Sequence, residues 1–206
     1  MTLLVGLGNP GGQYKLNRHN VGFMAVETLA HRHGLGPWRR KFQGQFVEGR
    51  LGSTKVRLLE PQTYMNESGR SVGEAARFYN LDPSDIVVFH DELDLAPGKV
   101  RVKLGGGHAG HNGLRSIAAH IGPDFKRVRI GIGHPGHKSA VQRWVLGDFA
   151  KSDRDWLVPM LDAMGDAASD LVADDAPKFM TRVAAAVKEV FPECLPGRPD
   201  QANDTQ

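Results

Sequence analysis

Strand-like and helix-like segments alternate along almost the whole chain, and this alternation limits the possible folds more than any other feature. The strand-like segments are short apolar runs bounded by Gly, Pro or Asp. They are Leu3–Gly6, Gly44–Arg50, Lys55–Leu59, Ile86–His90, Val100–Leu104 and Val128–Ile132. Segments with helical periodicity are Val21–His33, Ser68–Tyr79, Gly113–Ile121, Ala140–Leu146, a long stretch from about Ser152 to Val172, and Pro177–Val190. This order predicts the α/β class: a single domain whose twisted, mixed and mostly parallel sheet is flanked by helices.

Prolines and acidic residues mark the boundaries expected near the C-terminus. Pro159 is expected either to kink the long helix or to mark its true start. Asp174 and Asp175 are candidate N-caps of the last helix, which should end before Pro192. We therefore expect one domain over residues 1–191 and a flexible tail over residues 192–206, which are rich in Pro, Asp, Gln and Asn.

Composition excludes several classes of protein. No apolar stretch approaches the roughly 20 residues that a membrane helix needs. The first residues lack the basic segment of a signal peptide. The single cysteine, Cys194, excludes a disulfide framework and fits a reducing compartment. We therefore expect a cytoplasmic protein without membrane association.

Positive charge is clustered although the net charge is only +3. The cations gather in residues 38–41, 99–103 and 126–129. In the second and third stretches they alternate with valine, so they should share one face of a strand. Such a face is either solvated, with lysine protecting a sheet edge, or a strip that binds phosphates.

Two glycine motifs match known site patterns by spacing alone. Residues 6–11 satisfy G-x-G-x-x-G, but helical periodicity starts only near Asn20, whereas a dinucleotide loop opens its helix at once. Residues 69–73 satisfy G-x-S-x-G, but the preceding strand ends about a dozen residues earlier, whereas a nucleophile elbow joins strand directly to helix. We expect the first motif to be a tight turn and Ser71 to be a surface or helix-start serine.

Polar residues gather where the predicted strands end. They are Asn9, Tyr14, His19 and Asn20; Thr63, Tyr64 and Asn66; His90, Asp91 and Glu92; and His108, His111 and Asn112. Ligand crevices of open α/β sheets lie at the carboxyl ends of strands, so these side chains could converge. Simpler alternatives exist: His19 as a surface or capping residue, Asp91 as a turn residue, and Asn66 and Asn112 as N-caps.

This set of residues favours one kind of chemistry. One histidine, one aspartate and several asparagines, without a suitable Ser or Cys nucleophile, point to direct attack by water on an activated acyl group. Histidine can be the general base, a carboxylate can fix its tautomer, and amides can donate to an oxyanion. The H-x-x-H pairs His108/His111 and His134/His137 lie among Gly and Pro and lack a third ligand motif. We therefore expect neither a metal nor a cofactor.

Several longer segments, taken together, resemble the bacterial peptidyl-tRNA hydrolase family. These segments are GLGNPGGQY, RHNVGF, PQTYMNESG, HDELDLAPGKVRVKLGGGHAGHNGLRSI and RVRIGIGHP, in the order of that family. The resemblance covers about residues 2–190, and the glycine-histidine block with HDELDL is its most specific part. It implies hydrolysis of the ester between a peptide, or an N-blocked aminoacyl group, and the 3′-terminal ribose of tRNA. It also implies recycling of tRNA from prematurely released peptidyl-tRNA by a monomer without an obligate protein partner.

The same resemblance implies individual roles. His19 would be the general base, Asp91 its supporting carboxylate, and Asn9 the residue that senses the peptide next to the ester. Asn66 and Asn112 would hold the peptide main chain or the tRNA terminus, with Tyr14 and Tyr64 beside them. His111 would belong to the same binding group and help to position Asn112 or a water molecule. Lys103 and Arg129 would clamp a tRNA phosphate. Tyr64 departs slightly from the family pattern, because some members have phenylalanine there, and the amide that stabilises the oxyanion stays open.

Three other functions compete with this interpretation. The first is a tRNA-binding module without catalysis. The second is a nucleotide-dependent enzyme that uses the glycine turn, and the third is a serine esterase that uses Ser71.

Overall fold

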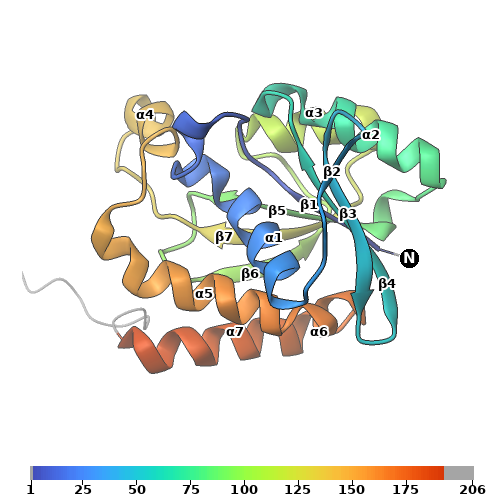
Figure 1. The fold of residues 1–206 in the computed structure, drawn as a ribbon. Helices are drawn as coiled ribbons and strands as arrows, with labels where there is room; N and C mark the ends of the chain where they lie inside the picture. The colour runs from blue at the N-terminus through green and yellow to red at the C-terminus, as the bar shows by residue number, and fades with distance from the viewer. Residues whose placement is uncertain (1, 193–206) are drawn as a thin grey trace, which may run out of the picture.

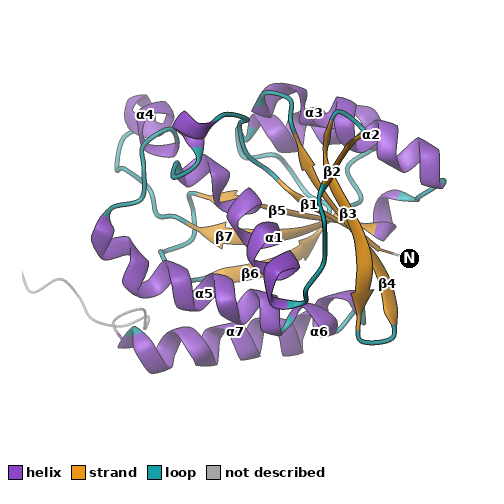
Figure 2. Ribbon diagram, in the orientation of Figure 1, coloured by secondary structure: helices purple, strands orange, loops and turns teal. Residues whose placement is uncertain are grey.

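A seven-stranded sheet runs through the centre of the molecule, and its topology decides where a site can form (Figures 1 and 2). The computed structural model describes residues 2–192. The strands are β1 (Thr2–Gly6), β2 (Arg39–Lys41), β3 (Gly44–Leu51), β4 (Thr54–Pro61), β5 (Ile86–Glu92), β6 (Val100–Leu104) and β7 (Lys126–Gly131). Their order is β2-β3-β4-β1-β5-β7-β6. The four strands β4, β1, β5 and β7 are parallel, and β3 and β6 pair antiparallel with their neighbours, which confirms the predicted mixed sheet.

Helices cover both faces of this sheet (Figure 1). They are α1 (Val21–Arg32), α2 (Ser68–Tyr79), α3 (Asn112–Ile121), α4 (Val141–Val145), α5 (Arg154–Asp166), α6 (Ala168–Val172) and α7 (Ala176–Val190). The core under α1, α5 and α7 includes Leu4 and Phe89, whereas the core under α2 and α3 includes Leu3 and Val88. Neighbouring strand residues thus serve opposite cores, as the two-residue period of a strand requires.

The strand order reverses beside β1. The chain leaves β1 and reaches β4 on one side, and then crosses through α2 to β5 on the other side. The carboxyl ends of these strands therefore border a crevice at a topological switch point. All seven residues of β5 are buried, which is typical of a parallel strand covered on both faces.

Some element boundaries differ from the predictions. The stretch from Ser152 to Val172 is not one helix, because α5 ends at Asp166 and α6 follows; Pro159 lies inside α5 and does not mark its start. The strand β2 was not predicted. The N-cap of α7 is Asp175, whose carboxylate accepts a hydrogen bond from the Lys178 N–H at 3.0 Å, as expected.

Two further expectations concern the end of the chain and membranes. Apart from Pro192, the predicted tail over residues 192–206 lies outside the described residues, as does Cys194, so the tail stays a prediction. Within residues 2–192, no helix combines the length and the apolar character needed to cross a membrane.

Candidate active site

A cleft of about 800 Å³ opens at the carboxyl ends of the central strands. Seven of the predicted site residues line it: Asn9, His19, Tyr64, Asn66, Asp91, His111 and Asn112. They come from the segments that follow β1 and β4, from the end of β5 and from the start of α3. The predicted convergence at the strand ends is therefore present.

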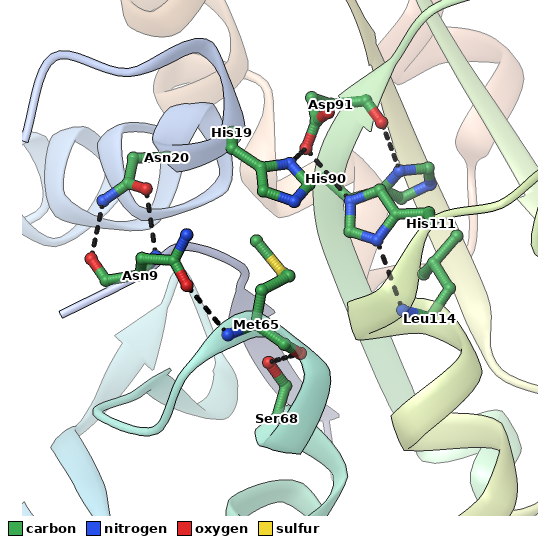
Figure 3. Close-up of polar contacts among 9 residues, drawn as sticks. All are labelled: Asn9, His19, Asn20, Met65, Ser68, His90, Asp91, His111 and Leu114. Carbon is green, nitrogen blue, oxygen red and sulfur yellow. Dashed lines mark hydrogen bonds and ion pairs between the residues drawn. The ribbon is translucent and has the colours of Figure 1, made fainter. Parts of the chain in front are cut away.

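Two histidines point at one carboxylate on the floor of this cleft (Figure 3). His19 Nδ1 lies 2.8 Å from Asp91 Oδ1, and His111 Nε2 lies 3.0 Å from the same oxygen. Asp91 is not the turn residue of the alternative interpretation, because it is a buried residue of β5. When His19 donates through Nδ1–H, its Nε2 keeps a lone pair, which is the form a general base needs.

The tautomer of His111 follows from its second contact. His111 is the N-cap of α3, and its Nδ1 accepts a hydrogen bond from the Leu114 N–H at 3.4 Å. The proton of the neutral ring must then sit on Nε2, where it is donated to Asp91. A second proton on His111 would remove the cap, so this contact favours His19 as the histidine of the pair that takes up a proton.

Charge and burial set the protonation of this group. Burial works against the charged form of His19, but the Asp91 carboxylate outweighs burial and raises the pKa of His19 above 6.5. Burial alone would also raise the pKa of Asp91, yet His19 and His111 together hold that pKa well below 3.8. Asp91 is therefore ionised at neutral pH and can stabilise a protonated His19.

His90 has a different environment from its neighbour Asp91. Its ring is buried, and Nδ1–H donates to the Asp91 carbonyl oxygen at 2.7 Å. Burial, with a contribution from His111, lowers the pKa of His90 to about 3. His90 is therefore neutral at physiological pH and does not compete with His19 as a base.

The asparagine after β1 is held in one orientation. Asn9 Oδ1 accepts a hydrogen bond from the Met65 N–H at 2.8 Å, so its Nδ2 is left as the donor on the side that faces His19 (Figure 3). One amide side chain, Asn20, holds both backbone groups of Asn9: Oδ1 accepts from the Asn9 N–H at 3.0 Å, and Nδ2 donates to the Asn9 carbonyl at 2.9 Å. The glycine turn thus presents a fixed amide donor to the cleft.

The three groups His19, Asp91 and His111 also have the composition of a metal site. Among the described residues they are the one cluster of at least three His, Cys, Asp or Glu whose ligand atoms lie within 4.8 Å of one another. A metal ligand must offer a lone pair, however, and the Leu114 N–H places the His111 proton on the nitrogen that faces Asp91. The hydrogen bonds therefore favour two shared protons over an ion at this place.

A second pocket of about 220 Å³ lies beside the cleft and is rich in cations. Lys103, Arg127 and Arg129 line it, and His90, Glu92, His108 and Ala109 line both pockets. In the register of β6 and β7, Lys103 lies opposite Arg127 and Arg101 lies opposite Arg129. A single face of cations is therefore confirmed for Arg101, Lys103, Arg127 and Arg129, whereas Lys126 lies on the opposite face of β7 and Lys99 lies outside β6.

The cations of this pocket differ in how they are bound. Arg127 is buried and donates to the carbonyls of Gly106 and Gly107, at 2.8 and 2.5 Å, so it holds the glycine loop. Arg129 pairs with Glu92 at 2.8 Å, and Lys103 is exposed. Lys103 and Arg129, the predicted phosphate clamp, therefore share one pocket.

Several alternative interpretations of site residues were wrong. Asn66 lies inside a 3₁₀ turn (Met65–Glu67) and Asn112 is the first residue of α3, so neither is an N-cap. Ser71 is buried inside α2 and donates to the Phe42 carbonyl at 2.6 Å, so it is a helix-start serine, neither on the surface nor at a nucleophile elbow. One residue of the main prediction also lies elsewhere, because Tyr14 is not among the residues that line the cleft.

The glycine turn also differs from a nucleotide loop, as expected. After Gly11 the chain forms two 3₁₀ turns, η1 (Gly12–Tyr14) and η2 (Arg18–Asn20), and α1 begins only at Val21. The helix N-terminus that would bind a pyrophosphate is therefore not at the glycine turn.

Sequence reasoning missed the residues that hold the site together. Asn20 is among the polar residues expected at the strand ends, but the sequence gives it no role, and Met65 contributes through its backbone N–H, which no sequence pattern marks. Apolar residues of one cleft wall, Val141, Val145 and Leu146, were read simply as part of a helix. The four-residue spacing of Val141 and Val145 was the signal that could have indicated a common helix face.

The comparisons with known proteins agree with this geometry. A sequence model of the family described as "Peptidyl-tRNA hydrolase" matches residues 3–190. The chain is 62% identical to a peptidyl-tRNA hydrolase of Dinoroseobacter shibae over 89% of this chain and 78% of the relative. It is 61% identical to one of Ruegeria pomeroyi over 97% and 83% of the two chains. A crystal structure of peptidyl-tRNA hydrolase from Acinetobacter baumannii is similar with a TM-score of 0.84 and 45% identity, over 90% of this chain and 95% of that one. The chain therefore belongs to the peptidyl-tRNA hydrolase family.

Proposed function

We propose that this protein is a hydrolase of peptidyl-tRNA that cleaves the ester between the peptide, or an N-blocked aminoacyl group, and the 3′-terminal ribose. The observation that carries this proposal is the His19–Asp91 contact of 2.8 Å on the floor of the cleft. Membership of the family supports the reaction, and the amide donor of Asn9 beside His19 supports an oxyanion intermediate.

The reaction needs no nucleophile other than water. His19 Nε2 takes a proton from a water molecule as its oxygen attacks the ester carbonyl, and the carbonyl oxygen becomes an oxyanion. Asp91 stabilises the imidazolium that forms. As the C–O bond to the ribose breaks, the imidazolium returns its proton to the leaving 3′-oxygen, which releases the peptide acid and free tRNA.

The amides have distinct tasks in this proposal. Asn9 Nδ2 donates to the oxyanion or to the peptide next to the ester, because its orientation is fixed by Met65. Asn66 and Asn112 are exposed in the cleft and hold the peptide main chain or the tRNA terminus, beside the exposed ring of Tyr64. His111, which also lines the cleft, supports Asp91 directly.

The second pocket takes a phosphate of the tRNA. Lys103 and Arg129 line it next to the wall that it shares with the cleft. One tRNA substrate could therefore place a phosphate in this pocket and its ester at His19 at the same time. We further propose that the enzyme works as a cytoplasmic monomer without a metal or a cofactor and returns tRNA to translation.

The first test is cleavage of N-blocked aminoacyl-tRNA by purified protein treated with EDTA. The expected result is ester cleavage by the natural chain and a loss of roughly 10²- to 10⁴-fold in His19→Ala, the range that a general base contributes. Binding of tRNA without cleavage by the natural chain would favour a binding module. Loss of cleavage after EDTA that Zn²⁺ or Mg²⁺ restores would favour a metal enzyme.

Asn9 offers a sharper test of the amide. Asn9→Asp keeps the oxygen that accepts from the Met65 N–H but replaces the donor, whereas Asn9→Ala removes both. Both variants should lose turnover and the discrimination between N-blocked and free aminoacyl-tRNA, measured as the ratio of the two kcat/KM values. If Asn9→Asp keeps normal turnover and discrimination, the donor role assigned to Asn9 is wrong.

A further inference from the structure

Three consecutive residues of the turn η2 hold three different parts of the site. His19 contacts Asp91 at the end of β5, and Asn20 holds the backbone of Asn9 after β1. Arg18 points to a third region, the segment from Trp144 to Asp153, which includes the end of α4 and the 3₁₀ turn η6 (Lys151–Asp153). Figure 1 shows α4 beside the N-terminal turn.

Arg18 has contacts on both its planar face and its edge. Its guanidinium carbon lies 3.8 Å from the centroid of the Trp144 ring, Nη1 donates to the Asp148 carbonyl at 2.8 Å, and Nη2 lies 3.4 Å from Asp153 Oδ2. Only 11% of the Arg18 side chain is exposed. A stacked and hydrogen-bonded guanidinium of this kind is held more firmly than an ordinary surface cation.

The backbone adds further contacts at the same place. The Arg18 N–H donates to the Gly147 carbonyl at 3.0 Å, and the Phe149 N–H donates to the Leu16 carbonyl at 2.9 Å. Asn17 Nδ2 donates to Asp148 Oδ1 at 2.7 Å. The loop that carries His19 is therefore fastened to residues 147–149 by side chains and main chain together.

The segment held by Arg18 is also a wall of the cleft. Val145 and Leu146 line the cleft, and they lie between Trp144 and Gly147 in the chain. Trp144 Nε1 in turn donates to the Gly133 carbonyl at 3.0 Å, so the ring that stacks on Arg18 is itself fixed. These contacts couple the position of the cleft wall to that of the turn η2, which carries His19.

We propose that Arg18 is a positioning residue for the hydrolysis: through Trp144, Asp148 and Asp153 it couples the turn that carries His19 to the cleft wall formed by residues 141–146. This inference rests on the proposed function of His19. Arg18 does not touch the reacting atoms. It keeps His19 Nδ1 at Asp91 and keeps His19 Nε2 aimed at the space in front of the wall.

The test compares Arg18→Gln, Arg18→Lys and Trp144→Leu with the control Arg154→Gln, which removes an exposed cation at the start of α5 close to the same segment. For each variant kcat, KM and the pH dependence of kcat are measured with N-blocked aminoacyl-tRNA, and a thermal unfolding curve shows that it is folded. Arg18→Gln should lower kcat by about ten- to a hundredfold, the loss expected for a misplaced catalytic group, with a small change in KM.

Two further readouts separate positioning from a merely structural role. Because Asp91 raises the pKa of His19, a loosened contact should shift the acid limb of the kcat profile to lower pH. Arg18→Lys should recover part of kcat. The double variant of Arg18→Gln and Trp144→Leu should lose no more kcat than the worse single variant, since both break one coupling.

The outcomes distinguish the two proposals. If the natural chain does not cleave the ester, the proposed function fails. If the natural chain and Arg154→Gln cleave it but Arg18→Gln keeps the natural kcat and acid limb, the positioning role of Arg18 is overturned. A fall in melting temperature without any shift of the acid limb would assign Arg18 to stability alone.

Discussion

The Asp91 carboxylate has two roles at the scale of single residues, because one oxygen receives both His19 and His111. It is buried and yet ionised, which is possible only because two ring N–H groups point at it. The same charge raises the pKa of His19. A protonated His19 cannot accept a proton from water, so kcat should rise with pH through a pKa above 6.5.

Asp91→Asn tests this coupling. The variant removes the charge but keeps a similar shape, so it should lose roughly 10²- to 10⁴-fold in kcat through the wrong tautomer and an unsupported imidazolium. The acid limb of its remaining activity should move to lower pH. A kcat profile measured between pH 5 and pH 9 gives both results, and an acid limb unchanged from the natural chain would contradict the coupling.

Much of the site could be predicted at this scale, because its chemistry resides in residue types that sequence motifs carry. Asn9, His19, Asp91 and His111 all line the cleft as predicted. The contacts that could not be predicted are those made by backbone groups. Neither the Met65 N–H that orients Asn9 nor the cap formed by His111 leaves a trace in residue identity.

Close packing of α1 against the sheet is the decisive feature at the scale of elements. A Cβ on Gly22 would overlap the Phe89 carbonyl oxygen and the Leu7 backbone nitrogen. Only glycine lets the helix approach the strands so closely, and η2 with His19 directly precedes this helix.

Gly22→Ala should therefore be destabilising although alanine favours helices. Without a clash the change would stabilise the helix by about 1 kcal/mol; overpacking should instead cost about 1–3 kcal/mol or more and displace η2, so kcat should fall as well. Denaturant unfolding measures the first effect. Gly12→Ala, where a Cβ meets nothing within 4 Å, is the matched control and should be nearly neutral.

A buried carboxyl of β4 makes a second prediction at this scale. Burial, with added repulsion from Glu27 of α1, raises the pKa of Glu60 to about 8, and Glu60 Oε1 has no hydrogen-bond partner among the described residues. Folding therefore retains a proton that the unfolded chain releases near 4.5. This contribution to stability is complete below pH 4.5 and is lost as the pH rises through about 8.

Glu60→Gln should remove this dependence. The variant should lose less stability than the natural chain between pH 6 and pH 9, with a difference on the order of a few kcal/mol. Melting temperatures at these two pH values, for both proteins in the same buffers, provide the measurement. An equal change in melting temperature between the two pH values for both proteins would show that Glu60 does not retain its proton in the folded state.

The strand β2 shows why some elements escaped prediction. Its residues, Arg39–Lys41, lack the apolar alternation of a strand. Its turn to β3 is formed by Phe42 and Gln43, both with φ above +50°, where hairpins of this kind usually have Asn-Gly or Gly. Burial of the Phe42 ring against Phe46 accounts for this choice of residue, and such tertiary packing is invisible in a local pattern.

At the scale of the whole molecule the main feature is a pair of adjacent pockets. A shared wall separates the cleft that contains the histidine base from the pocket that contains the cations. The fold class and the strand ends were predictable from alternating elements. The position of the cationic pocket next to the cleft was not predictable from these elements, because it depends on the antiparallel placement of β6 beside β7. Only the register brings Lys103 and Arg129 into one pocket.

Lys103→Ala should weaken tRNA substrates and reduce the slope of log(kcat/KM) against log[salt] by about 1, while turnover of a minimal ester without the tRNA body stays unchanged. Lys188→Ala, an exposed cation on α7, is the control. Arg129→Ala should act in the same direction but also leaves the buried Glu92 without its partner, so its stability must be measured too. Equal losses with both substrates would show that Lys103 does not bind a phosphate.

The contacts between the N-terminal loop and residues 147–149 have a consequence for folding of the newly synthesised chain. The contacts of the site span 56 residues between Asn9 and Met65, 72 between His19 and Asp91, and 131 between Asn17 and Asp148. Contacts between such distant residues form late in folding, because long loops must close first. During synthesis the chain remains without these contacts of the site until residues 147–149 have left the ribosome. In refolding from denaturant, recovery of activity should accordingly follow the slowest structural phase, never precede it.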